Sequence, residues 1–387
     1  MRILLEGHRL VHTRDLGGID SYWQRLVPEL LAAAGPEERF ILLTAFLNPR
    51  HARAIARFQD AGATLRHWWA APEALYALRR AGGRFEWFAG AHDVVHLPEP
   101  VCPLRTRARI VVTAHDLMYL HCPQFLQPRW TARLLRGTAA LARRAALWIC
   151  VSEHTRAEIV KHYGIARART VVIAHGVDGS FFAAAGENAR ARAVAARLGL
   201  AGDPYFLFVG SVEPKKNLPL LLEALGRAAA RPGGLRARLA VAGRAGWGTA
   251  SALDETLARW PLLRDRVHFL GFVAQADLAP LVAGARALVL PSRYEGFGMP
   301  VLEAMAAGTP VLASDRGALP EVAAGAALHF DPDDGDGLAG LLARVDEDDA
   351  LCEDLRTRGR VRAAGFTWRR CAEETLAAYR LAGTLPA

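Results

Sequence analysis

Short apolar runs alternate with longer stretches of helical periodicity through the first half of the chain. The runs are rich in Val, Ile and Leu, and the stretches between them are rich in Ala, Leu and Arg. This alternation is typical of βα units, whose strands form a parallel sheet with helices packed on its faces. The runs expected to form strands are residues 3–5, 40–43, 94–97, 110–113, 147–151 and 170–173.

The same alternation returns after a Gly- and Ala-rich break that begins beyond Asp178. Strands of a second sheet are expected at 205–209, 239–242, 267–270, 287–290 and 310–313. We therefore predict an α/β protein of two Rossmann-like domains, at 1–182 and 204–365, with a linker at 183–203 and an amphipathic helix at 366–387. Because ligands bind outside the carboxyl ends of parallel strands, we expect the two sheets to face a cleft at those ends.

Composition agrees with this organisation. A chain of 387 residues is too long for one ordinary core, and 52% hydrophobic with 22% charged residues is typical of a globular protein. No apolar run is long enough for a membrane span or a signal peptide. The five cysteines are scattered without a C-x-x-C pair, so we expect a cytoplasmic location and neither a disulfide framework nor a zinc site.

The chain is basic, with a formal net charge of +9. This charge is compatible with anionic substrates, anionic membranes or nucleic acid, and by itself it does not choose among them. Residues 127–148 are expected to form a helix on which five arginines share one arc, namely Arg129, Arg133, Arg136, Arg143 and Arg144. Two interpretations stay open: the helix lies peripherally on the inner face of an anionic membrane, beside a lipid-linked acceptor, or its basic face is simply solvated.

The most informative stretch is residues 294–303, Y-E-G-F-G-M-P-V-L-E, which joins an apolar strand to a helix. Pro300 suits the first helical position. The backbone N–H groups of Gly298 and Met299 would then lie at the positive end of the helix, where an anion binds. The stretch therefore predicts an anion site.

Two carboxylates, Glu295 and Glu303, bracket these backbone donors. Beside a phosphate, they fit as acceptors of hydrogen bonds from the hydroxyl groups of a nucleotide ribose and a sugar. A glycosidase also uses a pair of carboxylates, but its reaction has no anionic leaving group for a phosphate site to hold. We therefore expect a nucleotide sugar to bind here.

Two motifs of the first domain also follow expected strands. Gly17 and Gly18 precede a helix, and paired glycines there let a phosphate approach the backbone closely; a plain flexible loop is the alternative. His115 and Asp116 follow the strand at 110–113. His115 would contact a substrate hydroxyl or a leaving group, and Asp116 would orient it or bind the acceptor. A structural histidine is the alternative.

The second domain has a comparable motif after its first strand, V-G-S-V-E-P-K-K-N at 209–217. Gly210 and Ser211 form the turn, and Lys215 and Lys216 open a helix. Their ammonium groups would lie beside a diphosphate and stabilise it as it departs. Solvated lysines are the alternative, but the position at the carboxyl edge of a sheet favours the functional interpretation.

In their order along the chain, these motifs resemble those of the retaining GT-B glycosyltransferases of family four (group 1). The resemblance spans nearly the whole chain, through segments 17–18, 115–116, 151–155, 175–178, 210–217 and 295–303, the last with that family's E-x7-E spacing. It implies an acceptor-side first domain, a donor-binding second domain, and a terminal helix that crosses back to the first. It also implies that the enzyme needs neither a metal nor a cofactor besides its donor.

The resemblance implies a role for each matching residue. Lys216 would bind the donor diphosphate, Glu303 the ribose of the nucleotide and Glu295 the hydroxyls of the transferred sugar. His115 would lie at the reaction centre, with Asp116 on the acceptor side. The implied donor-binding residues are Gly17, Gly18, Gly210, Ser211, Lys215, Lys216, Glu295, Gly298, Met299 and Glu303, and the implied catalytic residues are His115, Lys216 and Glu295.

One departure concerns the residue after Gly210, which is Arg in many relatives and Ser211 here; Lys215 is expected to supply the missing cation. The form G-S-V-E-P-K-K-N, with the later segment 314–321, looks most like mannosyltransferases that build O-antigens and other bacterial polysaccharides. It points to GDP-mannose as the donor and to a glycan or lipid-linked acceptor. Nucleic acid is not expected as a partner.

The resemblance implies a retaining, metal-independent hexosyltransferase in which the leaving phosphate helps to take the acceptor's proton during front-face attack. Two alternatives stay open, a nucleotide-sugar epimerase of the same fold and a non-catalytic sugar-nucleotide-binding protein. An epimerase would interconvert the free nucleotide sugar without an acceptor. A binding protein would hold the donor tightly without transfer or hydrolysis.

Overall fold

The computed structural model describes residues 1–11, 17–102, 104–200, 202–244, 246, 248 and 250–385, apart from the side chains of residues 72, 73 and 76. The chain forms two compact units. Unit 1 combines Met1–Gly176 with Thr367–Ala387, and unit 2 is Val177–Phe366. Each unit is built on one parallel sheet, as the alternation of strands and helices predicted.

Unit 1 contains a seven-stranded sheet in the order β3-β2-β1-β4-β5-β6-β7. Its strands are β1 (Arg2–Glu6), β2 (Arg39–Ala45), β3 (Thr64–Trp68), β4 (Val94–Leu97), β5 (Arg109–Ala114), β6 (Leu147–Cys150) and β7 (Thr170–Val172). Its helices are α1 (Gly18–Ala33), α2 (Arg50–Asp60), α3 (Pro72–Arg80), α4 (Glu86–Ala89), α5 (Met118–His121), α6 (Pro128–Arg144), α7 (Glu153–Tyr163) and α17 (Trp368–Thr384).

The local sequence explains these elements. Every residue of β4 and β6 is buried, as expected for parallel strands covered on both faces. Helix α7 begins where the Ser152 hydroxyl accepts a hydrogen bond from the backbone N–H of Thr155 at 3.0 Å, and it ends at Gly164, whose φ of 63° is in the left-handed region. Both signals are favourable helix caps.

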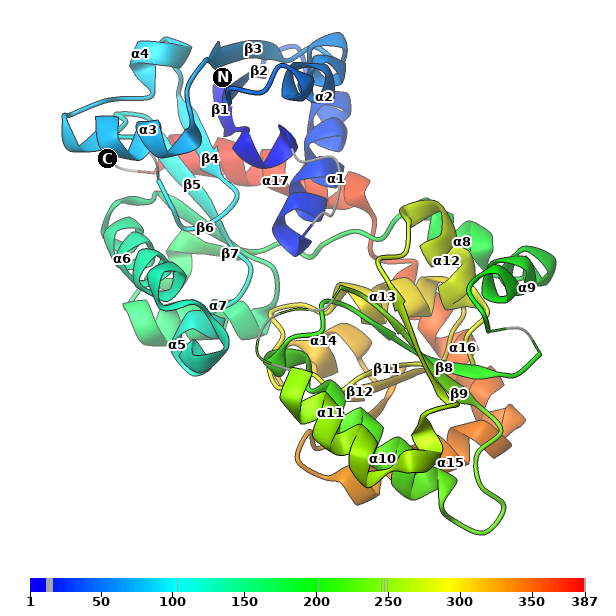
Figure 1. Cartoon of the computed structure of the whole chain (residues 1–387). Helices are drawn as coiled ribbons and strands as arrows, with labels where there is room; N and C mark the ends of the chain where they lie inside the picture. The colour runs from blue at the N-terminus through cyan, green and yellow to red at the C-terminus, as the bar shows by residue number, and fades with distance from the viewer. Residues whose placement is uncertain are drawn as a thin grey trace. The chain divides into compact units, whose positions relative to one another are not determined.

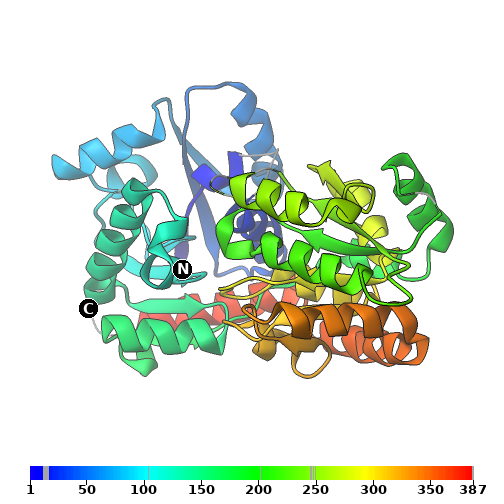
Figure 2. The ribbon, with the colours of Figure 1, turned by 60° about the horizontal axis from the view of Figure 1, so that its bottom comes forward.

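The terminal helix α17 belongs to unit 1. It packs against α1 and against β4, β5 and β6, and it is the red helix beside these elements in both views (Figures 1 and 2). The hydroxyl of its fully buried Tyr379 lies 2.5 Å from Nδ1 of His96 on β4. Where the helix begins, a Cβ on Gly176 would lie 2.2 Å from the backbone nitrogen of Trp368, so glycine permits this close approach.

Unit 2 contains a six-stranded sheet in the order β10-β9-β8-β11-β12-β13. Its strands are β8 (Tyr205–Val209), β9 (Arg238–Ala242), β10 (Val267–Gly271), β11 (Ala287–Leu290), β12 (Val311–Ser314) and β13 (Leu328–Phe330). Its helices are α8 (Gly179–Ala184), α9 (Asn188–Arg197), α10 (Leu218–Ala229), α11 (Ala250–Arg259), α12 (Gln275–Ala283), α13 (Met299–Ala306), α14 (Leu319–Ala323), α15 (Gly335–Glu347) and α16 (Asp349–Ala363).

The helices of unit 2 pack in two groups. α10 and α15 lie against each other and share one apolar core with the sheet (Figure 1). α8 and α9 pack on α12, and α13 packs on α16. Residues 183–203, which we expected to form a linker, therefore include α9 and are an integral part of unit 2.

Candidate active site

Two loops leave the carboxyl edge of the unit 2 sheet side by side, because β8 and β11 are neighbouring strands. The first loop follows β8 and contains Gly210, the exposed Ser211 and a short 3-10 turn, Pro214–Lys216. The second follows β11 and leads into α13. A backbone hydrogen bond of 2.8 Å from the N–H of Arg293 to the carbonyl of Lys215 joins the two loops. The donor motifs predicted from the sequence therefore meet at one edge of the sheet.

The two loops bring Lys216 and Glu295 into direct contact. Lys216 Nζ lies 2.6 Å from Glu295 Oε1, and the two side chains are only 12% and 11% exposed. Burial raises the pKa of Glu295, but the ammonium groups of Lys216 and Lys215, with the hydrogen bond from Lys216, outweigh burial and lower the pKa below its ordinary value. Glu295 is therefore ionised at neutral pH and acts as a hydrogen-bond acceptor, not as a general acid.

The backbone around Glu295 is held by segment 314–321, which the sequence pointed to only as a sign of the donor and not as part of the site. A Cβ on Gly317 would lie 2.2 Å from the carbonyl oxygen of Glu295, and Gly317 has a φ of +62°. The next residue, Ala318, donates its N–H to the same carbonyl at 2.9 Å. Gly317 is thus a positioning residue for Glu295.

Helix α13 begins at Met299, so Pro300 is its second residue, not the first as expected. Gly298 precedes the helix with a φ of +108°, a conformation that favours glycine. Glu303 lies four residues after Met299, one turn along the helix, and is half-buried. The N-terminus of α13 and both glutamates thus belong to one strand-loop-helix segment, as predicted.

In unit 1, Gly17 precedes α1 and Gly18 is its first residue. Asp15 and Leu16, which directly precede Gly17, lie outside the described residues. A Cβ on Gly18 would meet no atom of the described residues within 4 Å, and one on Gly17 would lie 3.7 Å from a carboxylate oxygen of Asp20. The fold itself does not require glycine at these two positions, so close approach of a ligand remains their proposed role.

His115 lies directly after β5, and its Nε2 is 2.9 Å from the carbonyl oxygen of Pro98. Burial lowers the pKa of His115 to about 4, although the Pro98 carbonyl and Asp116 oppose that shift. The ring is therefore neutral at pH 7. Because Nε2 faces a carbonyl, it carries the proton, and Nδ1 is left as a hydrogen-bond acceptor. Oδ1 of Asp116 accepts the backbone N–H of Met118 at 3.1 Å.

A charged cluster that was not predicted from the sequence lies at the same edge of the unit 1 sheet. Nη2 of Arg9 donates to Glu99 at 2.8 Å, and Nη1 of Arg9 donates to Asp20 at 3.3 Å. His8 pairs with Glu6, the last residue of β1. Burial lowers the pKa of His8, but the carboxylates of Glu6 and Glu99 raise it above its ordinary value. The position of two of these residues could have predicted the cluster, because Glu6 ends β1 and Glu99 closely follows β4.

Three buried histidines of unit 1 predict that its stability falls in acid. Burial lowers the pKa of His96 to about 3, that of His115 to about 4, and that of His175 well below 6.5. Below pH 6.5 the unfolded chain takes up protons that the folded unit excludes, so each group should remove roughly 1.4 kcal/mol per pH unit. His8, with its raised pKa, opposes this loss. The urea midpoint should be lower at about pH 5.5 than at about pH 7.5; equal midpoints would contradict this account.

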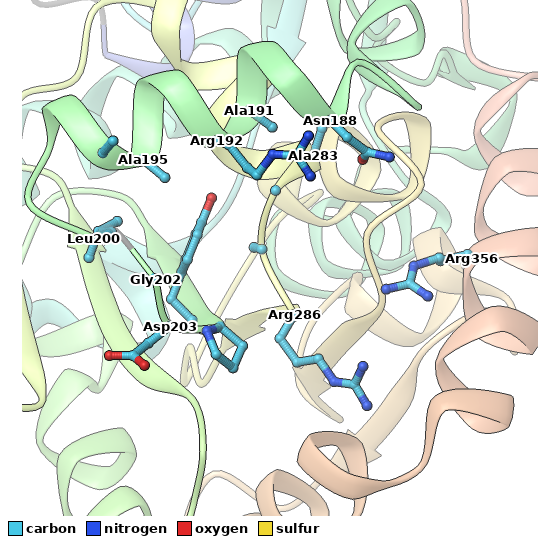
Figure 3. Close-up of a pocket in the computed structure, with 15 residues that line it drawn as sticks. Asn188, Ala191, Arg192, Ala195, Leu200, Gly202, Asp203, Ala283, Arg286 and Arg356 are labelled. Carbon is cyan, nitrogen blue, oxygen red and sulfur yellow. The ribbon is translucent and has the colours of Figure 1, made fainter.

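A pocket of about 540 Å³ lies elsewhere in unit 2. Figure 3 shows Arg192, Arg286 and Arg356 around it; Arg192 comes from α9, Arg286 directly precedes β11, and Arg356 comes from α16. Tyr205, the first residue of β8, also lines it. The pocket is therefore at the amino ends of these strands, opposite the edge that carries Lys216, and none of the predicted site residues lines it.

The basic helix expected at 127–148 is shorter in the structure. Helix α6 ends at Arg144, and Trp148 lies fully buried in β6. The exposed arginines of the predicted arc are Arg129, Arg136, Arg143 and Arg144, while the half-buried Arg133 lies 5.0 Å over the ring of Trp130. Across the described residues, no helix is long and apolar enough to span a membrane.

Comparison with known proteins identifies the family. The family described as Glycosyltransferase Family 4 matches residues 16–181, and that described as Glycosyl transferases group 1 matches residues 191–362. O-antigen chain mannosyltransferase B of Escherichia coli is 32% identical over 294 residues, which cover 74% of each chain. D-inositol 3-phosphate glycosyltransferase of Kineococcus radiotolerans is 34% identical over 263 residues, 64% of this chain and 59% of that protein.

Among solved structures, sucrose-phosphate synthase from Thermosynechococcus elongatus matches with a TM-score of 0.73 and 23% identity over 98% of both chains. At this identity the match establishes the fold alone. The fold is GT-B, with two α/β units that each contain a parallel sheet. The two family matches and the O-antigen mannosyltransferase add the activity class. The chain therefore belongs to the family 4 (group 1) glycosyltransferases.

Proposed function

We propose that this glycosyltransferase moves mannose from GDP-mannose, with retention of the anomeric configuration, to a glycan or lipid-linked acceptor in cell-surface polysaccharide synthesis. The observation that carries the proposal is the contact of 2.6 Å between Lys216 and Glu295. A cation suited to a diphosphate and a carboxylate suited to sugar hydroxyls are adjacent, as one nucleotide sugar would require. Similarity to the E. coli O-antigen mannosyltransferase supports mannose as the sugar.

In the proposed reaction, the bond between the sugar C1 and the diphosphate oxygen breaks, and C1 bonds to the acceptor oxygen on the same face. The acceptor's proton passes to the departing phosphate. Lys216, Lys215 and the N-terminus of α13 offset the negative charge that develops on that phosphate. Glu303 binds the ribose, and backbone donors of Gly298 and Met299 bind the phosphate.

Glu295 and His115 have separate tasks in this proposal. Glu295 stays ionised and accepts hydrogen bonds from hydroxyls of the transferred sugar, which fixes C1 relative to the phosphate. His115 is neutral, so its Nδ1 accepts a hydrogen bond from a sugar hydroxyl at the reaction centre. Asp116 contacts the acceptor. No step requires a metal ion or a further cofactor.

The donor can be identified with a panel of GDP, UDP and ADP sugars. Stabilisation follows occupancy, so GDP-mannose should give the largest rise in Tm and the fastest acceptor-free hydrolysis. Inorganic phosphate and mannose added separately serve as controls for incomplete ligands. A larger effect of a UDP or ADP sugar would overturn the assignment of GDP-mannose and leave the glycosyltransferase activity intact.

The mechanism can be tested once a product is in hand. NMR of the new glycosidic bond should show the anomeric configuration of the donor, and inversion would exclude the proposed front-face reaction. Metal-depleted enzyme should turn over at the same rate with and without added Mg²⁺ or Mn²⁺. A strict requirement for either ion would contradict metal-independent departure of the diphosphate.

Two alternatives are separated by products and acceptors. Conversion of GDP-mannose to another free nucleotide sugar without an acceptor would indicate an epimerase. Because the chain is similar to D-inositol 3-phosphate glycosyltransferases, D-inositol 3-phosphate should be tested as an acceptor beside mannose-containing glycans. Tight donor binding without transfer or hydrolysis across this panel would favour a non-catalytic binding protein.

We also propose a cytoplasmic enzyme that makes peripheral contact with an anionic membrane through the exposed arginines of α6. Vesicles rich in phosphatidylglycerol should co-sediment the protein at low salt, and salt should release it. Replacing Arg129, Arg136 and Arg143 with Gln should abolish this binding, whereas neutral vesicles should never bind. Equal binding of wild type and the triple variant would assign the arginines to a solvated face.

A further inference from the structure

Two histidines and a glutamate converge where the end of α5 meets α7. Glu158 and His162 are four residues apart on α7, so they share one face of the helix. His121, the last residue of α5, reaches the same point and pairs with Oε2 of Glu158. Nε2 of His162 lies 3.4 Å from that oxygen. Among the described residues, these three form the one group of His, Cys, Asp or Glu side chains whose ligand atoms all lie close enough together to share one ion.

The geometry of these three side chains suits a small cation. Their ligand atoms all lie within 4.8 Å of one another, and the two imidazole rings meet nearly edge to face, at 79° with centroids 5.2 Å apart. A tetrahedral ion with bonds of about 2.0–2.2 Å would separate its ligand atoms by roughly 3.3–3.6 Å. Small side-chain rotations are sufficient to reach that separation.

The ligand types and their exposure select the kind of ion. Imidazole nitrogens with one carboxylate oxygen suit Zn²⁺ and related transition metals, whereas Mg²⁺ and Ca²⁺ prefer oxygen ligands alone. The side chains of His121 and His162 are 32% and 31% exposed, and that of Glu158 is 13% exposed. Water can therefore reach the site and occupy a fourth coordination position.

We propose that His121, Glu158 and His162 form a binding site for one Zn²⁺ ion, separate from the residues assigned to the donor. An ion there would join α5 to α7 at one end of the segment that carries His115 and Asp116. The other end of that segment already contacts α7, because the Thr155 hydroxyl lies 3.5 Å from the carbonyl oxygen of His115. Bound Zn²⁺ would thus restrain residues 115–121 from both ends.

The test is titration of the full, metal-stripped chain with Zn²⁺ in competition with a chromophoric chelator. Wild type should bind one ion. His121→Ala, Glu158→Gln and His162→Ala should each lower the affinity of the protein for Zn²⁺ by more than about 10- to 100-fold, because that is the loss typically seen when a residue that only hydrogen-bonds to a metal ligand is removed. His51→Ala is the matched control, since it removes a histidine of α2 and should leave the affinity unchanged. Equal affinity in wild type and the three variants would overturn the proposal.

A second measurement needs no variant and covers the case in which a variant fails to fold. Zn²⁺ should slow hydrogen exchange in residues 115–122 and 158–162 and leave exchange in α2 unchanged. Co²⁺ at the same site should give visible absorption typical of four-coordinate geometry, and Zn²⁺ should displace it. Absence of a stoichiometric ion, or protection confined to other segments, would show that the cluster is held only by the pairing of the two histidines with Glu158.

Discussion

Lys216→Ala should lower kcat for donor turnover by about 10²–10³-fold, the effect typical of removing one preorganised donor from a developing charge. The same change leaves Glu295, only 11% exposed, without its nearest cation. We expect this to lower the free energy of unfolding by about 1–3 kcal/mol. The measurements are steady-state kinetics with the preferred donor and urea unfolding of the same preparations.

A double variant separates the two effects of Lys216→Ala. Lys216→Met combined with Glu295→Gln removes both charges, so unfolding free energy should return toward that of wild type. Turnover should stay low, because the diphosphate still lacks its cation. Near-normal transfer by folded Lys216→Ala would refute the assigned role, and recovery of turnover in the double variant would show that transfer needs neither the Lys216 ammonium nor the Glu295 carboxylate.

Gly317→Ala should lower the rate of sugar transfer by about 100-fold, although it removes no charged group. The reason is that a displacement of a catalytic group by about 1 Å typically costs this much in an active site. The added methyl group would lie 2.2 Å from the carbonyl oxygen of Glu295. The loop must therefore move, and Glu295 moves with it. Donor kinetics test this, and the expected pattern is a loss mainly in kcat because the diphosphate contacts of Lys216 remain.

Gly325→Ala is the matched control. Gly325 also lies in unit 2 and has a φ of +81°, but a methyl group there would meet no atom within 4 Å. Both variants share the strain of a left-handed alanine, about 1 kcal/mol, and only Gly317→Ala adds the collision. Equal losses of transfer in the two variants would show that the effect is general destabilisation and not displacement of Glu295.

Much of the fold could be predicted because parallel strands buried on both faces are almost entirely apolar. The strands that the sequence analysis missed are β3 and β13, each at an edge of its sheet. β3 reads T-L-R-H-W and is partly exposed along its length, so it lacks the apolar run of a central strand. The helix expected to continue to Trp148 ends at Arg144, because the chain after it enters the buried strand β6.

The candidate site was predictable where a motif follows a strand. The donor motifs at Lys216 and Glu295 follow β8 and β11, which are neighbours in the sheet although they are far apart in the sequence. No local sequence pattern reveals this order of strands. Their direct pairing across 79 positions of sequence was not predicted, because each had been assigned a separate part of the donor. Arg9 and Glu99 were missed because neither belongs to a recognisable motif.

The position of α17 has a consequence for synthesis of the protein on the ribosome. One of the two buried partners of His96 is Tyr379, 283 residues further along the chain. Unit 2 is complete once Phe366 has emerged, whereas unit 1 still lacks the helix that covers α1, β4, β5 and β6. Although domains generally fold in order from the N-terminus, the first unit to be translated should be the last to acquire its native protection from protease.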